Sequence, residues 1–177
     1  MIFEIIILVL TISLLIYLYS KNKDSLKFYI FIAVGVLLFE YFTQALWINR
    51  NLESWAYLYL DVSWILTIMW ADVIIFTLFL VERFNAKSTE LKKFFTSVAL
   101  VTIFVMAIEW ILIRTGVRWY PEAILKLYDS TPRLFGIMPL HEIIYVFSFI
   151  GLILAFAKYW QINYNLKFEK SIGGKSK

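Results

Sequence analysis

Long apolar stretches alternate with short polar loops along this chain. Five stretches stand out, near Ile2–Ser20, Phe28–Ile48, Leu60–Glu82, Phe94–Ile113 and Leu134–Lys158. A helix rises about 1.5 Å per residue, so each stretch is long enough to cross roughly 30 Å of hydrocarbon. A bend is expected near the start of the fifth, because Pro139 removes a helical hydrogen bond there. The pattern predicts an all-α, polytopic transmembrane helix bundle of about five spans.

The composition supports a membrane protein. Of the 177 residues, 62% are hydrophobic and 17% are charged, whereas soluble domains are roughly 45–50% apolar and about 25% charged. A disordered chain is thereby excluded, and a soluble domain is disfavoured. We expect residues 1–165 to form a single transmembrane bundle in a prokaryotic cell membrane, followed by a flexible polar tail over residues 166–177.

Several kinds of chemistry are excluded by residue counts and missing motifs. The chain has no cysteine and one histidine, His141, so thiolate chemistry and multi-histidine metal sites are ruled out. It contains no P-loop, no zinc-binding His-Glu-x-x-His and no mid-span lysine that could hold retinal. We predict no metal and no cofactor. The lysines mark membrane topology, so we predict no binding of nucleic acid.

The outer loops are rich in aromatic residues, namely Trp47, Trp55, Tyr57, Tyr59, Trp119, Tyr120 and Tyr128. An interfacial aromatic belt explains them. Alternatively, they belong to a lid, because residues 121–129 have the pattern of a short amphipathic helix with Pro121 in its first turn.

A weak internal repeat appears when the chain is shifted by 69 residues without gaps. The shift aligns Glu40 with Glu109, Leu58-Tyr59 with Leu127-Tyr128, and Asp72 with His141. This offset predicts parallel two-helix repeats over residues 28–82 and 94–158, plus one extra N-terminal helix, with a site at their interface. Apolar helices also match one another by chance, so coincidence stays open.

Four carboxylic acids lie within the predicted spans: Glu40, Asp72, Glu109 and Glu142. A charge at mid-bilayer costs about 2.5–3.5 kcal/mol on insertion scales. No basic residue is expected at the same depth, since Arg118 and its neighbours can snorkel to the outer surface. Neutral acids that bond neighbouring helices are one interpretation. A set of functional acids and bases in one outer-leaflet cavity is the other.

Two segments of the second unit resemble a known family. Residues 116–120 read Gly-Val-Arg-Trp-Tyr after Glu109-Trp110, and residues 134–145 read Leu-Phe-Gly-Ile-Met-Pro-Leu-His-Glu-Ile-Ile-Tyr. This resembles the lycopene cyclase domain of membrane-integral carotenoid cyclases. The family's paired acids appear here as His141-Glu142, and the first unit echoes the pattern more loosely.

The resemblance implies redox-neutral acid–base chemistry on an isoprenoid or carotenoid-like lipid. It implies Glu142 as the acid and Glu40 or Glu109 as the base, with Asp72 and His141 completing the catalytic set. It further implies that substrate binding and cation stabilisation fall to Trp64, Trp70, Trp110, Trp119 and Tyr145.

Two other classes of function stay open. Parallel repeats and intramembrane acids are also typical of a small proton-coupled transporter. An accessory subunit of a membrane complex, in a homo- or hetero-oligomer, is the third interpretation. The expected partners are a membrane lipid or isoprenoid substrate and neighbouring membrane chains.

The distribution of basic residues predicts the orientation. Twelve of the seventeen Lys and Arg residues follow the first, third and fifth stretches, so the positive-inside rule places the N-terminus outside and the C-terminus inside. A single cysteine replacing Lys175 should therefore resist membrane-impermeant thiol reagents in intact cells and react after permeabilisation. Ready labelling in intact cells would contradict this orientation.

Overall fold

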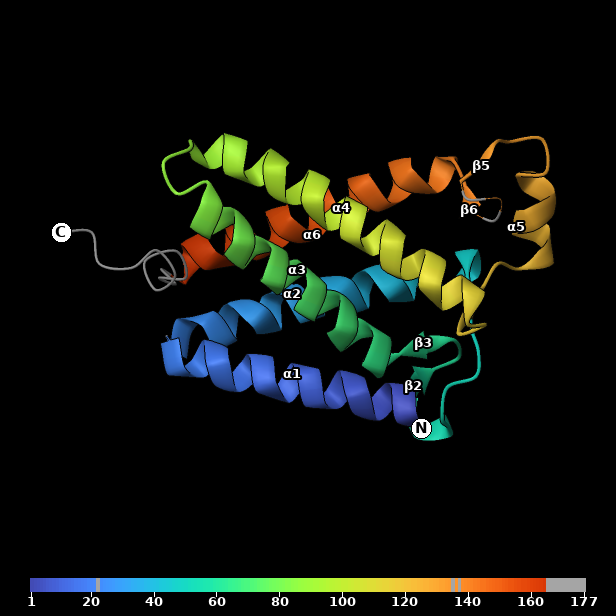
Figure 1. Ribbon diagram of the computed structural model, residues 1–177, viewed down its shortest axis with the longest axis horizontal. Coiled ribbons are helices and arrows are strands. Elements are labelled where there is room, and N and C mark those ends of the chain that lie inside the picture. Colours follow the sequence, from blue (N-terminus) through green and yellow to red (C-terminus); the bar gives the residue numbers. More distant parts are fainter. Residues whose placement is uncertain (22, 135, 137, 165–177) are drawn as a thin grey trace.

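The computed structural model describes residues 1–21, 23–134, 136 and 138–164, and the expected polar tail lies outside these residues. Five described helices are long and apolar enough to cross a membrane: α1 (Ile2–Lys21), α2 (Lys23–Thr43), α3 (Trp64–Phe84), α4 (Glu90–Arg114) and α6 (His141–Asn163). The predicted all-α bundle with five spans is confirmed (Figure 1). The protein is an integral membrane protein.

Four of the helices form a ring. Helix α2 packs against α3 and α6, and α4 packs against the same two helices. Branched apolar side chains such as Ile32, Val36, Ile74, Val105 and Ile150 fill the centre. Helix α1 packs on the outside, against α2 and α3. Apolar burial does not drive helix association within lipid, so close packing and hydrogen bonds hold the ring together.

The connections at one end of the ring are ordered by short hydrogen-bonded segments. They comprise η1 (Gln44–Leu46), β1 (Ile48–Asn49), η2 (Ser54–Ala56), β2 (Tyr57–Tyr59), β3 (Val62–Ser63), β4 (Arg118–Trp119), α5 (Glu122–Leu127), β5 (Arg133–Leu134) and β6 (Met138–Pro139). The antiparallel pairs are β1–β4, β2–β3 and β5–β6. The short predicted helix is confirmed as α5, with Pro121 directly before it. Figure 1 shows α5 and the two hairpins at the end of the bundle opposite the C-terminus.

Several predicted span boundaries are wrong by four or more residues, and two of them show the reason. The fifth span begins at His141, seven residues after the expected start, and Pro139 lies in β6 instead of bending the helix. The second helix ends at Thr43, before Ile48, which pairs with β4. In both places apolar residues belong to extended segments whose hydrogen bonds come from another strand. Hydropathy alone does not separate such segments from a helix end.

The contacts have a two-fold pattern. Strand β1 pairs Asn49 with Arg118, two residues that the 69-residue offset makes equivalent. The hairpins that follow are related by 76 residues, because Tyr57 and Val62 in β2–β3 correspond to Arg133 and Met138 in β5–β6. The additional seven residues fall in the connection that contains α5.

The unbroken offset is therefore wrong beyond the first loop of each unit. Leu58-Tyr59 lies in strand β2, but Leu127-Tyr128 forms the end of α5. A shift of 76 instead of 69 pairs Asp72 with Ser148, so its alignment with His141 is also wrong. The duplication itself stays a prediction.

Asp72 serves the packing of α1. Its carboxylate accepts hydrogen bonds from Thr11 of α1, at 2.5 Å, and from the Tyr29 hydroxyl of α2, at 2.9 Å. Asp72 lies in the third turn of α3, two residues after the buried Trp70, on the side that meets α1 and α2. The three-helix contact gives this acid a structural role.

Removing the hydroxyl of Thr11 should loosen α1. Thr11→Val leaves one Asp72 oxygen without its donor, and hydrogen bonds between membrane helices contribute about 0.6–1.7 kcal/mol. We expect the free energy of unfolding in mixed micelles to fall by about 1 kcal/mol. Thr102→Val is the matched control, because Thr102 is equally buried and its hydroxyl donates within its own helix, to the backbone oxygen of Val98. Equal effects of the two substitutions would contradict the docking role of Asp72.

Candidate functional site

The end of α4 turns Arg118 back toward the bundle. After Thr115 the chain passes through Gly116, with a φ of +74°, a left-handed conformation that favours glycine. The N–H of Val117 donates to Leu112, and the N–H of Gly116 donates to Ile113. These are the two hydrogen bonds of a Schellman motif, which reverses the chain direction at a helix end. Strand β4 begins directly afterwards and carries Arg118 inward.

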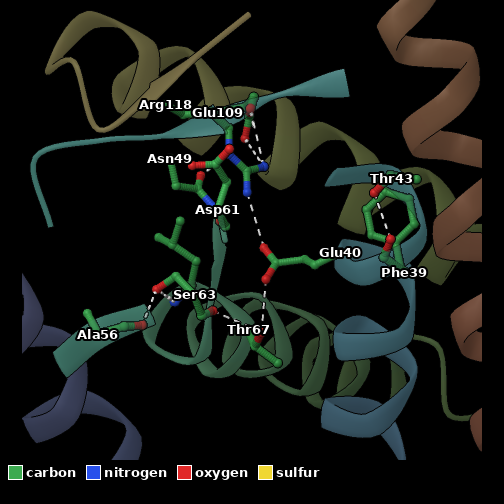
Figure 2. Close-up of polar contacts among 11 residues, drawn as sticks. Phe39, Glu40, Thr43, Asn49, Ala56, Asp61, Ser63, Thr67, Glu109 and Arg118 are labelled. Carbon is green, nitrogen blue, oxygen red and sulfur yellow. Dashed lines mark hydrogen bonds and ion pairs between the residues drawn. The ribbon is translucent and has the colours of Figure 1, made fainter. Parts of the chain in front are cut away.

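Arg118 forms the centre of a buried ion-pair network. Only 3% of the residue is exposed. Its Nη2 lies 3.1 Å from Glu40 Oε1, and its Nη1 lies 3.2 Å from Glu109 Oε2 (Figure 2). The guanidinium also lies over the rings of Trp47 and Trp70, at 5.0 and 5.8 Å from their centroids. One cation thus joins the C-terminal ends of α2 and α4 and packs against two aromatic rings.

Neutral hydrogen bonds complete this network. The Nε of Arg118 donates to Asn49 Oδ1 at 2.9 Å, and Asn49 donates to the backbone oxygen of Asp61 at 2.5 Å. The Thr67 hydroxyl of α3 donates to the second oxygen of Glu40 at 2.9 Å. Asn49 and Arg118 also pair through their backbones in β1–β4. The guanidinium is therefore held in one orientation by two helices and both long loops.

The interpretation that the buried acids lack a basic partner is wrong. Burial by itself lowers the pKa of Arg118, but the carboxylates of Glu109, Glu40 and Glu142 outweigh it, and the pKa is raised. Arg118 therefore stays charged inside the bundle. Glu40 and Glu109 pair with this guanidinium, and Glu142 acts on it only at longer range. The cluster therefore carries more acid than base and can hold an exchangeable proton.

Glu142 differs from the two paired acids. It lies in the first turn of α6 and is 6% exposed. One carboxylate oxygen accepts a hydrogen bond from the Tyr120 hydroxyl. The other oxygen, Oε1, is buried and has no hydrogen-bond partner among the residues that the structure describes. Burial raises the pKa of Tyr120, and the neighbouring Glu142 raises it further, so this phenol stays a hydrogen-bond donor.

Two cavities meet at Glu142. The inner cavity, of about 40 Å³, lies within the ring and is bordered by Trp47, Trp70, Glu109, Arg118 and Glu142, with apolar residues below them. The outer cavity, of about 20 Å³, lies under α5 and is bordered by Trp47, Tyr120, Tyr128, Glu142 and Tyr145. A water needs roughly 10–15 Å³ of such volume, so each cavity has room for one to a few waters. Glu142 and Trp47 border both.

The structure brings together part of the predicted site. Glu40, Glu109 and Glu142 gather around Arg118, and Trp70 joins them. Asp72 does not join them, because it binds Thr11 and Tyr29. His141 is exposed and stacks on Tyr128, with ring centroids 5.3 Å apart.

The five aromatic residues predicted for the site fall into two groups, those that border a cavity and those that do not. Tyr145 borders the outer cavity, where its hydroxyl accepts from Tyr128 at 3.0 Å. Among the described residues that border the two cavities, Trp64, Trp110 and Trp119 are absent. Trp64 donates to the backbone of Trp55, Trp110 lies beside Arg114, and Trp119 is 42% exposed. Three of the five aromatic predictions therefore fall outside the cavity walls.

Sequence reasoning missed four residues of the site: Trp47, Asn49, Arg118 and Tyr120. Trp47 and Tyr120 were grouped with the interfacial aromatic residues, and Arg118 with the snorkelling ones. The offset of 69 residues that aligns Glu40 with Glu109 also aligns Asn49 with Arg118. This alignment, together with the helix-ending Gly116, was the available signal that Arg118 faces inward.

The arrangement is suited to proton transfer. It offers a buried carboxyl with one unpaired oxygen, a phenol that donates to the other oxygen, and a fixed cation nearby. Within the described part of the chain, no group of three or more His, Cys, Asp or Glu residues is placed to hold a metal ion. Comparison with family models, curated proteins and solved structures found no match for this chain. Its function is therefore argued from the chemistry of these side chains.

Loss of Arg118 should destabilise the bundle strongly. Arg118→Leu leaves the buried carboxylates of Glu40 and Glu109 without a cation, and breaking a buried pair in this way costs about 3–5 kcal/mol. We expect a drop of this size in the free energy of unfolding. Arg114→Leu is the control, because Arg114 is exposed on the same helix end.

A rescue experiment separates charge from packing. Adding Glu40→Gln and Glu109→Gln to Arg118→Leu should recover part of the lost stability, because the unpaired charges are removed. If Arg118→Leu is as mild as Arg114→Leu, or if the rescue fails completely, the ion-pair network does not have the role assigned to it.

Proposed function

We propose that the protein is an integral membrane enzyme that performs redox-neutral acid–base chemistry on a hydrophobic isoprenoid or carotenoid-like chain. The observation that carries this proposal is the position of Glu142. Its unpaired Oε1 lies in an apolar setting where two cavities meet. A buried carboxyl without a basic partner is expected to hold a proton, and it can deliver that proton to a reactant that cannot hydrogen-bond.

The proposed reaction balances as an isomerisation. The carboxyl of Glu142 adds its proton to a terminal carbon–carbon double bond, and the electron pair of that bond forms the new C–H bond. The resulting tertiary carbocation is attacked by a second double bond, which closes a ring and moves the positive charge. A neighbouring carbon then loses a proton to a carboxylate, and the electron pair of the broken C–H bond forms the final double bond. One proton is added and one is removed, so product and substrate have the same composition.

Glu109 is better suited than Glu40 to accept the departing proton. Glu109 borders the inner cavity, whereas Glu40 is turned toward Arg118 and Thr67. Trp47 and Trp70 offer ring faces to the same cavity, and an aromatic face attracts a cation. With both acids ionised, the Arg118 network carries a net charge of −1, which also favours a passing carbocation.

The resemblance to the lycopene cyclase domain supports this choice of chemistry. The two segments that carry the resemblance contribute Arg118, Tyr120, Glu142 and Tyr145 to the cavity walls. The sequence departs from the family pattern at His141, a position that does not face the cavities. His141, which replaces one of the paired acids, is exposed beside Tyr128, so only Glu142 of that pair faces the cavities.

One observation favours a proton-coupled transporter instead. Glu142 borders both the outer and the inner cavity, and a carboxyl with access to two compartments can pass a proton between them. The two candidates differ in a measurable property. A transporter moves protons across liposomes that contain the purified protein, whereas a cyclase changes the absorption spectrum and retention time of an added polyene.

Replacement of Glu142 should abolish the reaction. Glu142→Gln keeps the shape and one hydrogen-bond acceptor but has no acidic proton. In cells that accumulate linear carotenes, we expect cyclised product to fall by about 10²–10⁴-fold, the usual contribution of general acid catalysis. Tyr120→Phe should reduce the rate less, because it removes only the hydrogen bond to the carboxylate. His141→Asn should have a smaller effect still.

Asp72→Asn is the matched acid control, because Asp72 is an intramembrane carboxyl that lies apart from the cavities. It should leave the product yield unchanged per molecule of folded protein. Full activity of Glu142→Gln, or loss of activity in folded Asp72→Asn, would contradict the proposed mechanism.

A further inference from the structure

An open apolar groove runs along the outside of the ring between α2 and α6. Its volume is about 210 Å³, and it is bordered by Gly35, Leu38, Phe39, Phe42, Phe149, Leu152, Ile153 and Phe156. Leu38 and Leu152 at its rim are 45% and 65% exposed. Most of these residues lie in the middle of α2 and α6, and Phe42 lies near the end of α2. The groove therefore opens toward lipid along membrane-spanning helices.

The groove and the inner cavity share a wall. Phe39, Phe149 and Ile153 border both spaces. The rings of Phe39 and Phe149 lie 4.2 Å apart between their centroids, with their planes tilted by 48°. A chain in the groove is therefore separated from the cavity of Glu142 by one layer of side chains. Rotation of two phenyl rings is a small motion compared with the separation of helices.

Gly35 helps to form the groove. A Cβ atom built there would lie 3.3 Å from Ile153 and 3.4 Å from Phe156, so any larger side chain would extend into the space. The 69-residue offset equates Gly35 with Phe104 on α4, where the exposed ring occupies the corresponding surface. The chain thus has glycine where α2 borders the groove and phenylalanine at the equivalent position of α4.

We propose that this groove binds the linear part of a conjugated polyene drawn from the membrane, while its end group passes Phe39 and Phe149 to reach Glu142. The inference rests on the proposed function and names the route and the class of ligand. The inner cavity of about 40 Å³ cannot contain a long chain, so most of the substrate must lie outside it. Four phenylalanines border the groove, and their faces suit a flat conjugated chain better than a flexible saturated one.

The test measures binding without turnover. Glu142→Gln protein is produced in cells that accumulate lycopene, the linear C40 polyene used as the probe, and is then purified. Retained polyene is counted from the ratio of visible to protein absorbance, and circular dichroism in the polyene band reports a fixed, chiral setting. We expect retention near one polyene per chain with an induced dichroic band.

Leu38→Trp is the blocking variant. Leu38 is exposed at the rim, so a larger side chain there can extend into the groove without disturbing the packing of the four helices. We expect it to lower retention at least fivefold and to remove the induced band. Ala107→Trp is the matched control, since Ala107 is the exposed residue equivalent to Leu38 by the 69-residue offset. It should retain the polyene as the parent protein does. Both variants are compared only after they give the same elution profile as the parent.

Three results would overturn the groove proposal: no retained polyene in the parent, equal retention by Leu38→Trp, or equal loss in Ala107→Trp. Phospholipid that copurifies in place of the polyene, and is lost in Leu38→Trp, would also overturn it by assigning the groove to a saturated acyl chain. Failure of the catalytic proposal looks different, because either the unsubstituted protein would then form no cyclised product or Glu142→Gln would still form it.

Discussion

The rest of this structure depends on a guanidinium that is buried among carboxylates at the end of the bundle opposite the C-terminus. Arg118 is within 3.2 Å of oxygens on both α2 and α4 and is bound by Asn49 from the other long loop. None of these charges is stable in hydrocarbon alone, so the helix ends and loops must meet where they do. The paired strands β1 and β4 follow from the same need, because they hold Asn49 and Arg118 side by side.

The buried acids have different roles because each one faces different partners. Glu40 and Glu109 neutralise Arg118, and Asp72 fixes α1 through hydroxyl groups. Glu142 is left with a phenol on one oxygen and no partner among the described residues on the other. Acids that are chemically alike thus differ in availability because of what each one faces. An exchangeable proton is most useful on the carboxyl that is least engaged in structure, and that carboxyl borders both cavities.

Hydropathy and periodicity are enough to predict five helices, the short α5 and the location of Glu40, Glu109 and Glu142 within long helices, because the membrane restricts a chain so strongly. They could not predict the inward turn of Arg118, since an arginine near a helix end is equally able to snorkel. The choice depends on the reversal at Gly116 and on carboxylates from a distant helix. The position of Pro139 is wrongly predicted for a related reason. The sequence from Leu134 to Pro139 is apolar enough for a span, but Leu134, Met138 and Pro139 pair in β5–β6 instead.

The helix contacts of the ring follow a two-fold pattern, but the reactive side chains do not, because they gather on the side of α6. Asn49 stands where the offset would put a second Arg118, and Leu66 stands where a shift of 76 residues would put a second Glu142. The 69-residue offset equates Gly35 with Phe104, and the small glycine leaves a groove between α2 and α6. This groove lies on the side of the bundle that carries Glu142. Two equivalent cations would repel each other across the β1–β4 pair, where their side chains would share the same acids. A single arginine with one neutral partner avoids that repulsion, and the surplus carboxyl, its phenol and the open groove then all fall on the side of α6.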